Sequence, residues 1–311
     1  MKLIQSIVCL PLLAALLTAC QRDNVDDVKF EVTTEDVKVK VNQNVHFAFQ
    51  GNPDYVVFYP GTKTCAYENR ERTELSALSA LDLSCKIEQV YTEVKAYKGQ
   101  TLLKAYISTD FSGVYSKESI AAATWTEIPG LQMPVSDKAN VTIDQTKTSL
   151  YDYLDQDFYV AFKYDAGPNQ FESNYSKPRI QIKLLTLNKV DTDGYAYPMT
   201  DVANDWGFRC VPVKTLPAAL NYQVTESMIT FFPDAAEKEN DVEVWMISRK
   251  IQAKSVEPDR GMPIKSTNAR LPYYDYRYSK PGTYKATFVA TNAMMWDASQ
   301  TVRELTIEVT E

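Results

Sequence analysis

The chain has a single histidine, His46, and lacks the short motifs of common catalytic sites. Its 311 residues contain no GxSxG, HExxH, GxxxxGKS/T or GxGxxG. His46 lies in the alternating run 45–49, which predicts a strand with His46 on the outward face. A Ser-His-Asp triad, a Cys-His pair or a histidine-rich metal site would depend on this one residue. The sequence therefore predicts a protein that is not an enzyme and uses no cofactor.

Basic residues are also few. There are 33 lysines and arginines against 40 acidic residues, a net charge of −7. Nucleic-acid binding calls for clustered Lys and Arg, so we expect no nucleic-acid partner. The acidic residues leave a glycosidase open, because that chemistry needs only two carboxylates at a suitable separation. No pair stands out, and an enzyme acting on polysaccharide ranks last among our hypotheses.

Long apolar runs are absent beyond the N-terminus. Lys2 is followed by an uncharged run to Leu17, and small residues then precede Cys20. This pattern predicts a bacterial lipoprotein signal over residues 1–19, with Cys20 as the lipid attachment site. A plain signal peptide and a membrane-spanning helix are the alternatives, although the run is short for a span. The membrane is thus an expected partner, reached through the lipid.

Cysteine is scarce too. Besides Cys9 in the signal and Cys20, the chain contains Cys65, Cys85 and Cys210, with no CxxC spacing that would indicate zinc. Cys65 and Cys85 form a disulfide in one interpretation, and in the other they are buried free thiols.

What the chain does have is a series of short β-branched and aromatic runs separated by turn residues. This pattern predicts an all-β protein, a jelly-roll sandwich flanked by immunoglobulin-like β-sandwich segments. Leu75–Leu83 is compatible with a short helix and is taken as a domain junction. The predicted parts are the signal peptide (1–19), a lipidated tether (20–29), an N-terminal immunoglobulin-like segment (30–80), a jelly-roll-like domain (81–215) and a C-terminal immunoglobulin-like domain (216–311).

The N-terminal segment is short for a complete sandwich. Either it is a reduced module, or it packs with the C-terminal strands across an inserted jelly roll. We expect separate modules.

Two stretches carry a family resemblance. Residues 276–292, YRYSKPGTYKATFVATN, resemble the closing hairpin of polycystic-kidney-disease (PKD) type domains, without the Gly-Asp-Gly turn that precedes it there. Residues 45–61 and 67–73 are similar to the start of the Bacteroidetes lipoproteins of domain of unknown function 5017, and residues 108–113 with Trp125 fit that family's middle part. The resemblance implies an outer-membrane lipoprotein beside glycan-uptake systems of the SusC/SusD kind. Asp23, Asp26 and Asp27 look like surface-export tethers in that phylum, which implies a location facing the cell exterior.

Aromatic residues, with 20 Tyr and 4 Trp, are the candidate ligand-binding groups. Sugar rings stack on exposed Trp or Tyr, although β-sandwich cores use aromatic residues as well. The run 273–278 places tyrosines on both faces of a strand, so some must face outward. Trp125 and Trp245 lie within strand-like runs and are expected in the core. The residues at predicted loop edges, and thus the candidate ligand-binding set, are Trp296, Trp206 and Tyr115.

Asp191 and Asp193 precede Gly194 and resemble the start of a calcium loop. The later ligands of such a loop are missing, so a solvated turn is the preferred interpretation and no metal is expected. The leading functional hypothesis is a lipid-anchored, non-catalytic surface protein that binds glycans. The alternative is an adhesive or structural lipoprotein that binds a protein partner.

Overall fold

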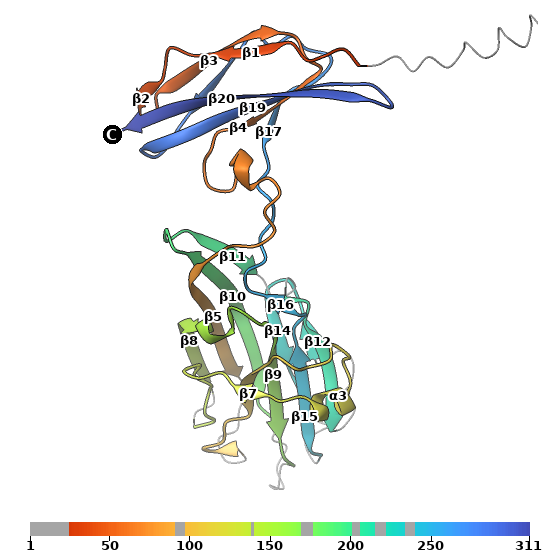
Figure 1. Cartoon of the computed structure of the whole chain (residues 1–311). Helices are drawn as coiled ribbons and strands as arrows, with labels where there is room; N and C mark the ends of the chain where they lie inside the picture. Colours follow the sequence, from red (N-terminus) through yellow and green to blue (C-terminus); the bar gives the residue numbers. More distant parts are fainter. Residues whose placement is uncertain are drawn as a thin grey trace, which may run out of the picture. The chain divides into compact units, whose positions relative to one another are not determined.

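The computed structural model describes residues 25–90, 97–137, 140–168, 177–200, 206–214, 222–233 and 240–311. Within them the chain is almost entirely β-structure, and its sheets form sandwiches (Figure 1). This confirms the predicted all-β class. The signal peptide, Cys20 and Asp23 lie outside the described residues.

The chain folds into two compact units. Unit 1 contains residues 1–73 and 257–311, and unit 2 contains residues 74–256. Unit 2 is thus an insertion within the sequence of unit 1. The structure differs here from the predicted separate N- and C-terminal modules and follows the alternative in which the two pack together. The physical reason is strand pairing: β4 (Tyr55–Tyr59) pairs only with C-terminal strands, and β3 (Asn44–Gly51) has a C-terminal strand on the side that β1 leaves open.

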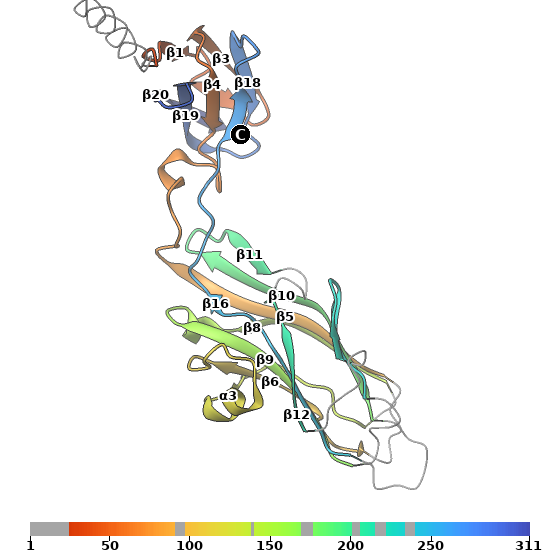
Figure 2. The same ribbon diagram turned by 90° about the vertical axis from the view of Figure 1, so that its right-hand side faces the viewer.

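Unit 1 is a sandwich of a three-stranded sheet, ordered β1-β3-β18, and a five-stranded sheet, ordered β17-β4-β19-β20-β2 (Figures 1 and 2). Its strands are β1 (Phe30–Thr33), β2 (Lys38–Lys40), β3 (Asn44–Gly51), β4 (Tyr55–Tyr59), β17 (Met262–Lys265), β18 (Tyr273–Arg277), β19 (Gly282–Ala293) and β20 (Ala298–Thr310), and a 3-10 turn covers Tyr67–Asn69. Neighbouring strands are antiparallel, except that β2 runs parallel to β20.

The core of unit 1 combines side chains from both ends of the sequence. The Phe58 ring from β4 stacks on Phe288 from β19, with centroids 4.6 Å apart, and Phe47 from β3 contacts both rings. All three are fully buried. Because aromatic side chains dominate the energy of burial, neither end of the chain holds a complete core by itself.

Tyr278 fixes the chain between β18 and β19. Its hydroxyl donates a hydrogen bond to the Pro60 carbonyl over 3.0 Å, and its ring stacks on Tyr284 at 4.3 Å. Burial raises the pKa of the Tyr278 phenol above its usual range. This hydrogen bond joins the N-terminal and C-terminal parts of unit 1, which are 218 residues apart in sequence.

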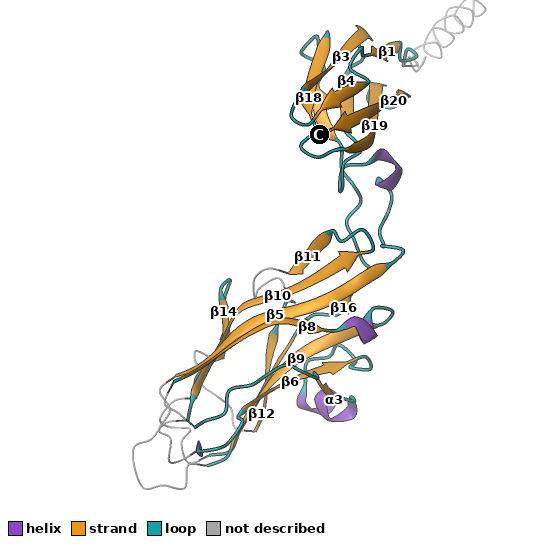
Figure 3. Ribbon diagram, turned by 90° about the vertical axis from the view of Figure 1, so that its left-hand side faces the viewer, coloured by secondary structure: helices purple, strands orange, loops and turns teal. Residues whose placement is uncertain are grey.

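Unit 2 is formed by two six-stranded sheets (Figure 3). One has the order β13-β14-β10-β5-β8 with β11 paired to β10, and the other has the order β12-β15-β9-β6-β7 with β16 paired to β9. The strands of the first sheet are β5 (Leu78–Val90), β8 (Val141–Ser149), β10 (Arg179–Asp191), β11 (Ala196–Thr200), β13 (Tyr222–Val224) and β14 (Met228–Phe231). Those of the second are β6 (Leu103–Ser108), β7 (Thr126–Glu127), β9 (Asp157–Ala166), β12 (Arg209–Lys214), β15 (Val242–Ile247) and β16 (Ile251–Gln252).

In its described residues unit 2 also contains α3 (Lys117–Ala122) and a 3-10 turn (Tyr151–Tyr153). The Ser116 side chain caps α3 by accepting the Ser119 N–H. The stretch considered for a helix, Leu75–Leu83, instead begins strand β5, although the boundary between the units does fall near it, at Thr73 and Glu74.

Strand β9 is buried on both faces, which explains its continuous apolar sequence. Phe158, Val160 and Phe162 belong to the main core of unit 2. Tyr159 and Ala161 belong to a second cluster on the other side of the sheet. The sheet containing β9 therefore has a satellite core on its outer face.

Candidate binding surfaces

The outer face of β18 in unit 1 combines an exposed aromatic ring with polar side chains. Along β18 exposed residues alternate with half-buried ones, so Tyr273, Asp275 and Arg277 face solvent. Tyr274 and Tyr276 face inward, with ring centroids 5.4 and 5.2 Å from Phe58. This alternation follows from the pleat of the strand and agrees with the predicted division of the tyrosines between two faces.

Strand β3 adds two further residues to this surface. Register pairs Asp275 with His46 and Arg277 with Asn44. The His46 Nδ1 atom lies 2.7 Å from the Asp275 carboxylate, and its ring lies 4.9 Å from the Tyr273 ring at an interplanar angle of 33°. The Arg277 guanidinium donates a hydrogen bond to the Asn44 side-chain oxygen. We call the set Asn44, His46, Tyr273, Asp275 and Arg277 the β18 face.

The β18 face offers several kinds of contact on one strand pair. Tyr273 is 51% exposed, and the His46 and Asp275 side chains are 52% and 42% exposed. The tyrosine provides an apolar ring with a hydroxyl, Asp275 provides acceptors, and Arg277 provides donors. Such a surface suits a ligand that presents both hydroxyl groups and C–H faces.

The second exposed surface is the loop between β19 and β20. Met294, Met295 and Trp296 are 56%, 82% and 73% exposed. The Met294 N–H donates to the Asp297 carbonyl over 2.9 Å, which closes the four-residue turn. We call Met294, Met295 and Trp296 the hairpin tip. The prediction that Trp296 lies at a loop tip is confirmed, and its role in binding a ligand stays a prediction.

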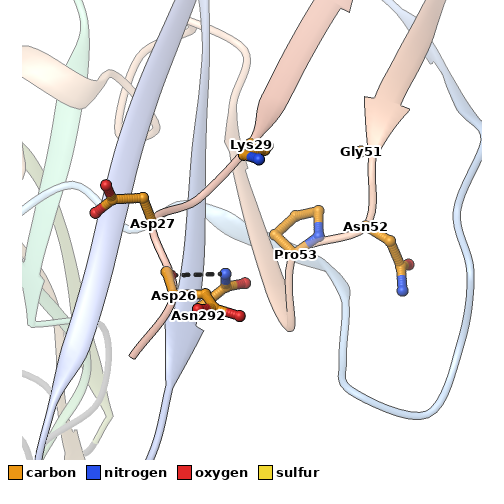
Figure 4. A pocket seen from close by; sticks show the side chains of 7 residues that line it. All are labelled: Asp26, Asp27, Lys29, Gly51, Asn52, Pro53 and Asn292. Atoms are coloured by element: carbon orange, nitrogen blue, oxygen red, sulfur yellow. Dashed lines mark hydrogen bonds between the residues drawn. The ribbon is translucent and has the colours of Figure 1, made fainter. Parts of the chain in front are cut away.

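A polar groove lies close to the hairpin tip, beside Asn292 near the end of β19 (Figure 4). It has a volume of about 500 Å³ and is lined by Asp26, Asp27, Lys29, Gly51, Asn52, Pro53 and Asn292. The Asn292 amide donates to the Asp26 carbonyl, as Figure 4 shows, and the side chains of Asp27 and Asn52 point outward on opposite sides. The groove is therefore bounded by the N-terminal segment and by the turn between β3 and β4.

Gly51 brings these two segments close together. Its φ of +97° is rare for other residues, and a Cβ atom there would lie 1.9 Å from the Lys29 carbonyl oxygen. Only glycine permits this approach of β3 to the residues before β1.

Trp206 does not belong to an exposed site. The structure places it in the core of unit 2 with no exposed area, its ring stacked on Phe208 at 5.6 Å and its Nε1–H directed at the Leu185 carbonyl over 3.4 Å. The prediction of a loop-edge ligand residue was wrong here. Asn204, Asp205 and Gly207 resemble a loop in sequence, but burial of the large indole outweighs its polar neighbours.

Tyr115 is half-buried rather than presented to a ligand. Its hydroxyl donates to the Ser248 carbonyl over 3.0 Å, and the Arg209 guanidinium lies 4.8 Å above its ring. Burial raises the pKa of the Tyr115 phenol. With these partners Tyr115 mainly helps to hold the segment before α3 against the sheet.

Tyr115 packs on the satellite core, and several other aromatic residues belong to the same cluster. Trp245 stacks on Tyr106 at 5.4 Å and contacts Trp125 at 5.1 Å. Trp245 is 6% exposed and Trp125 half-buried, close to the core placement expected for both. The cluster seals α3 and its flanking segment onto the sheet, which is a structural role.

The aspartate pair behaves as a turn. The buried Asp191 carboxylate accepts the backbone N–H groups of Asp193 and Tyr195 over 2.9 and 2.8 Å, while Asp193 is exposed. The Asp191 acceptor oxygen is thereby used to fix the backbone of the turn. No group of three metal-ligating side chains occurs among the described residues.

The three cysteines in the part of the chain that the structure describes are free thiols. Cys65 lies in unit 1 and Cys85 in unit 2, and neither is in a disulfide, so the alternative of free thiols is the one the structure supports. Burial raises the pKa of Cys85 to about 12, which leaves it as an unreactive thiol. Cys210, the third, is exposed.

Sequence reasoning placed His46 and some of the tyrosines outward, but it did not bring them together. Asp275, Arg277 and Asn44 were not singled out at all. The signal that identifies them is the alternation of 44–48 and 273–277, read together with a register that only the folded chain provides.

The described residues contain no helix of the length and hydropathy needed to cross a bilayer.

Comparison with known proteins gives one family. The model of the domain of unknown function DUF5017 matches residues 19–207, and no curated protein matches the chain. The matched region begins beside Cys20 and ends before β12, so it includes parts of both units without completing either. Since it spans more than half of the sequence, the chain belongs to the DUF5017 family.

Proposed function

We propose that this protein is a lipid-anchored, non-catalytic binding protein of the outer-membrane surface, and that it binds glycans on the β18 face. The observation that carries the proposal is the half-exposed Tyr273 ring beside His46, Asp275 and Arg277. A sugar ring has apolar C–H faces that pack on an aromatic ring, and hydroxyl groups that pair with carboxylate and guanidinium groups. The shallow β18 face suits an extended chain better than a small buried ligand, which takes a concave pocket.

Location is the second part of the proposal. Cys20 carries the lipid, and the acidic residues that follow direct the protein to the outer face, beside a SusC/SusD-like uptake system. Protease shaving of intact cells tests the location: digestion supports an exterior position, and protection that is lost on permeabilisation contradicts it.

Affinity electrophoresis of the mature protein in gels containing soluble polysaccharides tests glycan binding. We expect at least one polysaccharide to retard the protein and to retard the Tyr273→Ala variant much less. Tyr151→Ala is the matched control, because Tyr151 is similarly exposed, at 49%, but lies in unit 2. Migration unaffected by every polysaccharide would contradict the proposal, as would equal retardation of wild type and Tyr273→Ala.

A protein partner is the second candidate, favoured by the position of β18 at the end of its sheet. An edge strand can pair with an extended segment of another chain, and Tyr and Arg are enriched in protein interfaces. Pull-down from outer membranes with wild type and Arg277→Glu distinguishes this case. A protein captured by wild type alone, with no glycan retardation, supports it.

A further inference from the structure

The hairpin tip is an exposed apolar surface of unit 1. Strand β4 pairs with β19 only from Thr287 to Thr291, so the end of the β19–β20 hairpin continues past it (Figure 1). Met294, Met295 and Trp296 follow the last strand pair, Ala293 with Ala298, and each exposes more than half of its surface. Adjacent exposed apolar residues of this size mark an interaction site.

The N-terminal segment lies along the same hairpin. The Val25 N–H donates to the Asp297 carboxylate over 3.1 Å, and the Val28 N–H donates to the Ser299 hydroxyl over 3.3 Å. Between them the Asp26 carbonyl accepts from the Asn292 amide. Three consecutive contacts thus fix residues 25–28 to the hairpin, with Val25 beside the turn that carries Trp296.

Position in the sequence then limits how far the tip lies from the lipid. Val25 is five positions after Cys20, and a fully extended chain spans at most about 3.6 Å per residue, or about 18 Å in all. An acylated Cys20 has its chains in the bilayer. Val25 therefore lies within about 18 Å of the membrane surface, and the turn that carries the hairpin tip is hydrogen-bonded to Val25.

We infer that the hairpin tip inserts into the lipid surface next to the anchor and fixes the orientation of unit 1 on the membrane. The inference rests on the lipid anchor of the proposed function. The tip suits this contact because Trp has an amphipathic ring that favours the membrane–water interface, and the two methionines are apolar and adaptable.

Charge near the tip defines the kind of lipid contact. Asp26 and Asp27 line the groove close to the tip together with Lys29, and Asp297 in the turn already accepts the Val25 and Ala298 N–H groups. These carboxylates provide no attraction to anionic headgroups. The contact is therefore apolar, occurs on zwitterionic lipid, and does not weaken as salt is raised.

Fluorescence quenching in vesicles tests the inference. The lipidated protein is reconstituted into phosphatidylcholine vesicles with or without bromine on the upper acyl chain, and tryptophan emission is compared. We expect lower emission in the brominated vesicles for wild type, and no bromine-dependent loss for Trp296→Phe. Trp125→Phe is the matched control, because it removes a half-buried tryptophan of unit 2 and leaves the loss in place.

The outcomes separate the two proposals. Flotation with vesicles that is lost in Cys20→Ser confirms the anchor independently of the tip. An anchored protein with equal emission in both kinds of vesicle overturns the inference alone, and a loss that persists in Trp296→Phe does the same. A protein that does not float with vesicles overturns the anchor and the inference together. Glycan retardation that is lost in Trp296→Phe would instead assign the tip to the ligand and overturn the inference.

Discussion

The Asn292 side-chain amide donates a hydrogen bond to the Asp26 carbonyl over 3.1 Å, while its oxygen accepts the Asp54 N–H over 3.2 Å. One side chain on β19 thus joins the N-terminal segment to the turn before β4. These residues are more than 230 positions from Asn292 in sequence. The groove of unit 1 and the path of the N-terminal segment both depend on this residue.

Replacing Asn292 is expected to release the N-terminal segment. Asn292→Ala removes two hydrogen bonds, each contributing about 1 kcal/mol, and should accelerate exchange of the Val28 amide hydrogen. Hydrogen exchange measured by mass spectrometry on N-terminal peptides tests this. Unchanged exchange in residues 25–29 would show that Asn292 does not hold the segment.

Asp259 is a buried carboxylate that connects the two segments of unit 1 that lead to and from unit 2. It accepts the Ala66 N–H over 2.9 Å and pairs with Arg72 at 3.0 Å. Asp259→Ala leaves both donors unpaired, so we expect about 3 kcal/mol of destabilisation. Native-state hydrogen exchange of β19 amides measures it. Glu257→Ala is the control, since its exposed pair with Arg260 contributes at most about 0.5 kcal/mol, and equal effects of the two variants would contradict the assignment.

Unit 1 needs both ends of the chain. A fragment of residues 216–311, the C-terminal domain predicted from sequence, lacks β4 and the Phe47 and Phe58 rings that pack on Phe288. We expect this fragment to be unfolded, whereas residues 25–73 joined to 257–311 by a short Gly-Ser linker should fold. Amide dispersion in NMR spectra distinguishes the two cases, and a dispersed spectrum of 216–311 alone would disprove the account of unit 1.

Glu88 makes unit 2 sensitive to acid. The Lys183 ammonium, 2.6 Å away, and Lys86 hold the Glu88 pKa below the usual 4.5. A lowered carboxyl pKa stabilises the fold at pH above 4.5, and this contribution is lost as the pH falls through the folded-state pKa. Glu88→Gln should therefore cost about 0.5–1 kcal/mol at pH 7 and nothing at the acid end. Urea unfolding followed by the emission of Trp206 and Trp245 tests this, and a constant difference from pH 7 to pH 3 would contradict it.

Much of the fold follows from local sequence. Alternation identifies β3 and β18, because the pattern of each strand is contained in its own residues. Pairing across the insertion does not follow, since the register of Asp275 with His46 joins segments 229 residues apart. The burial of Trp206 could not be predicted either, because its neighbours in sequence are polar and the strands that bury it are distant in sequence. Trp296 was easier to place, since the short turn between two long strands exposes it by geometry.

The central claim is that the β18 face binds glycans. Isothermal titration of a glycan that retards the protein in gels, into wild type and into Tyr273→Ala, tests this claim most directly. Loss of an aromatic stacking contact corresponds to roughly a tenfold change in affinity. The account predicts saturable binding by wild type and about tenfold weaker binding by Tyr273→Ala. Equal affinity of the two proteins would contradict it.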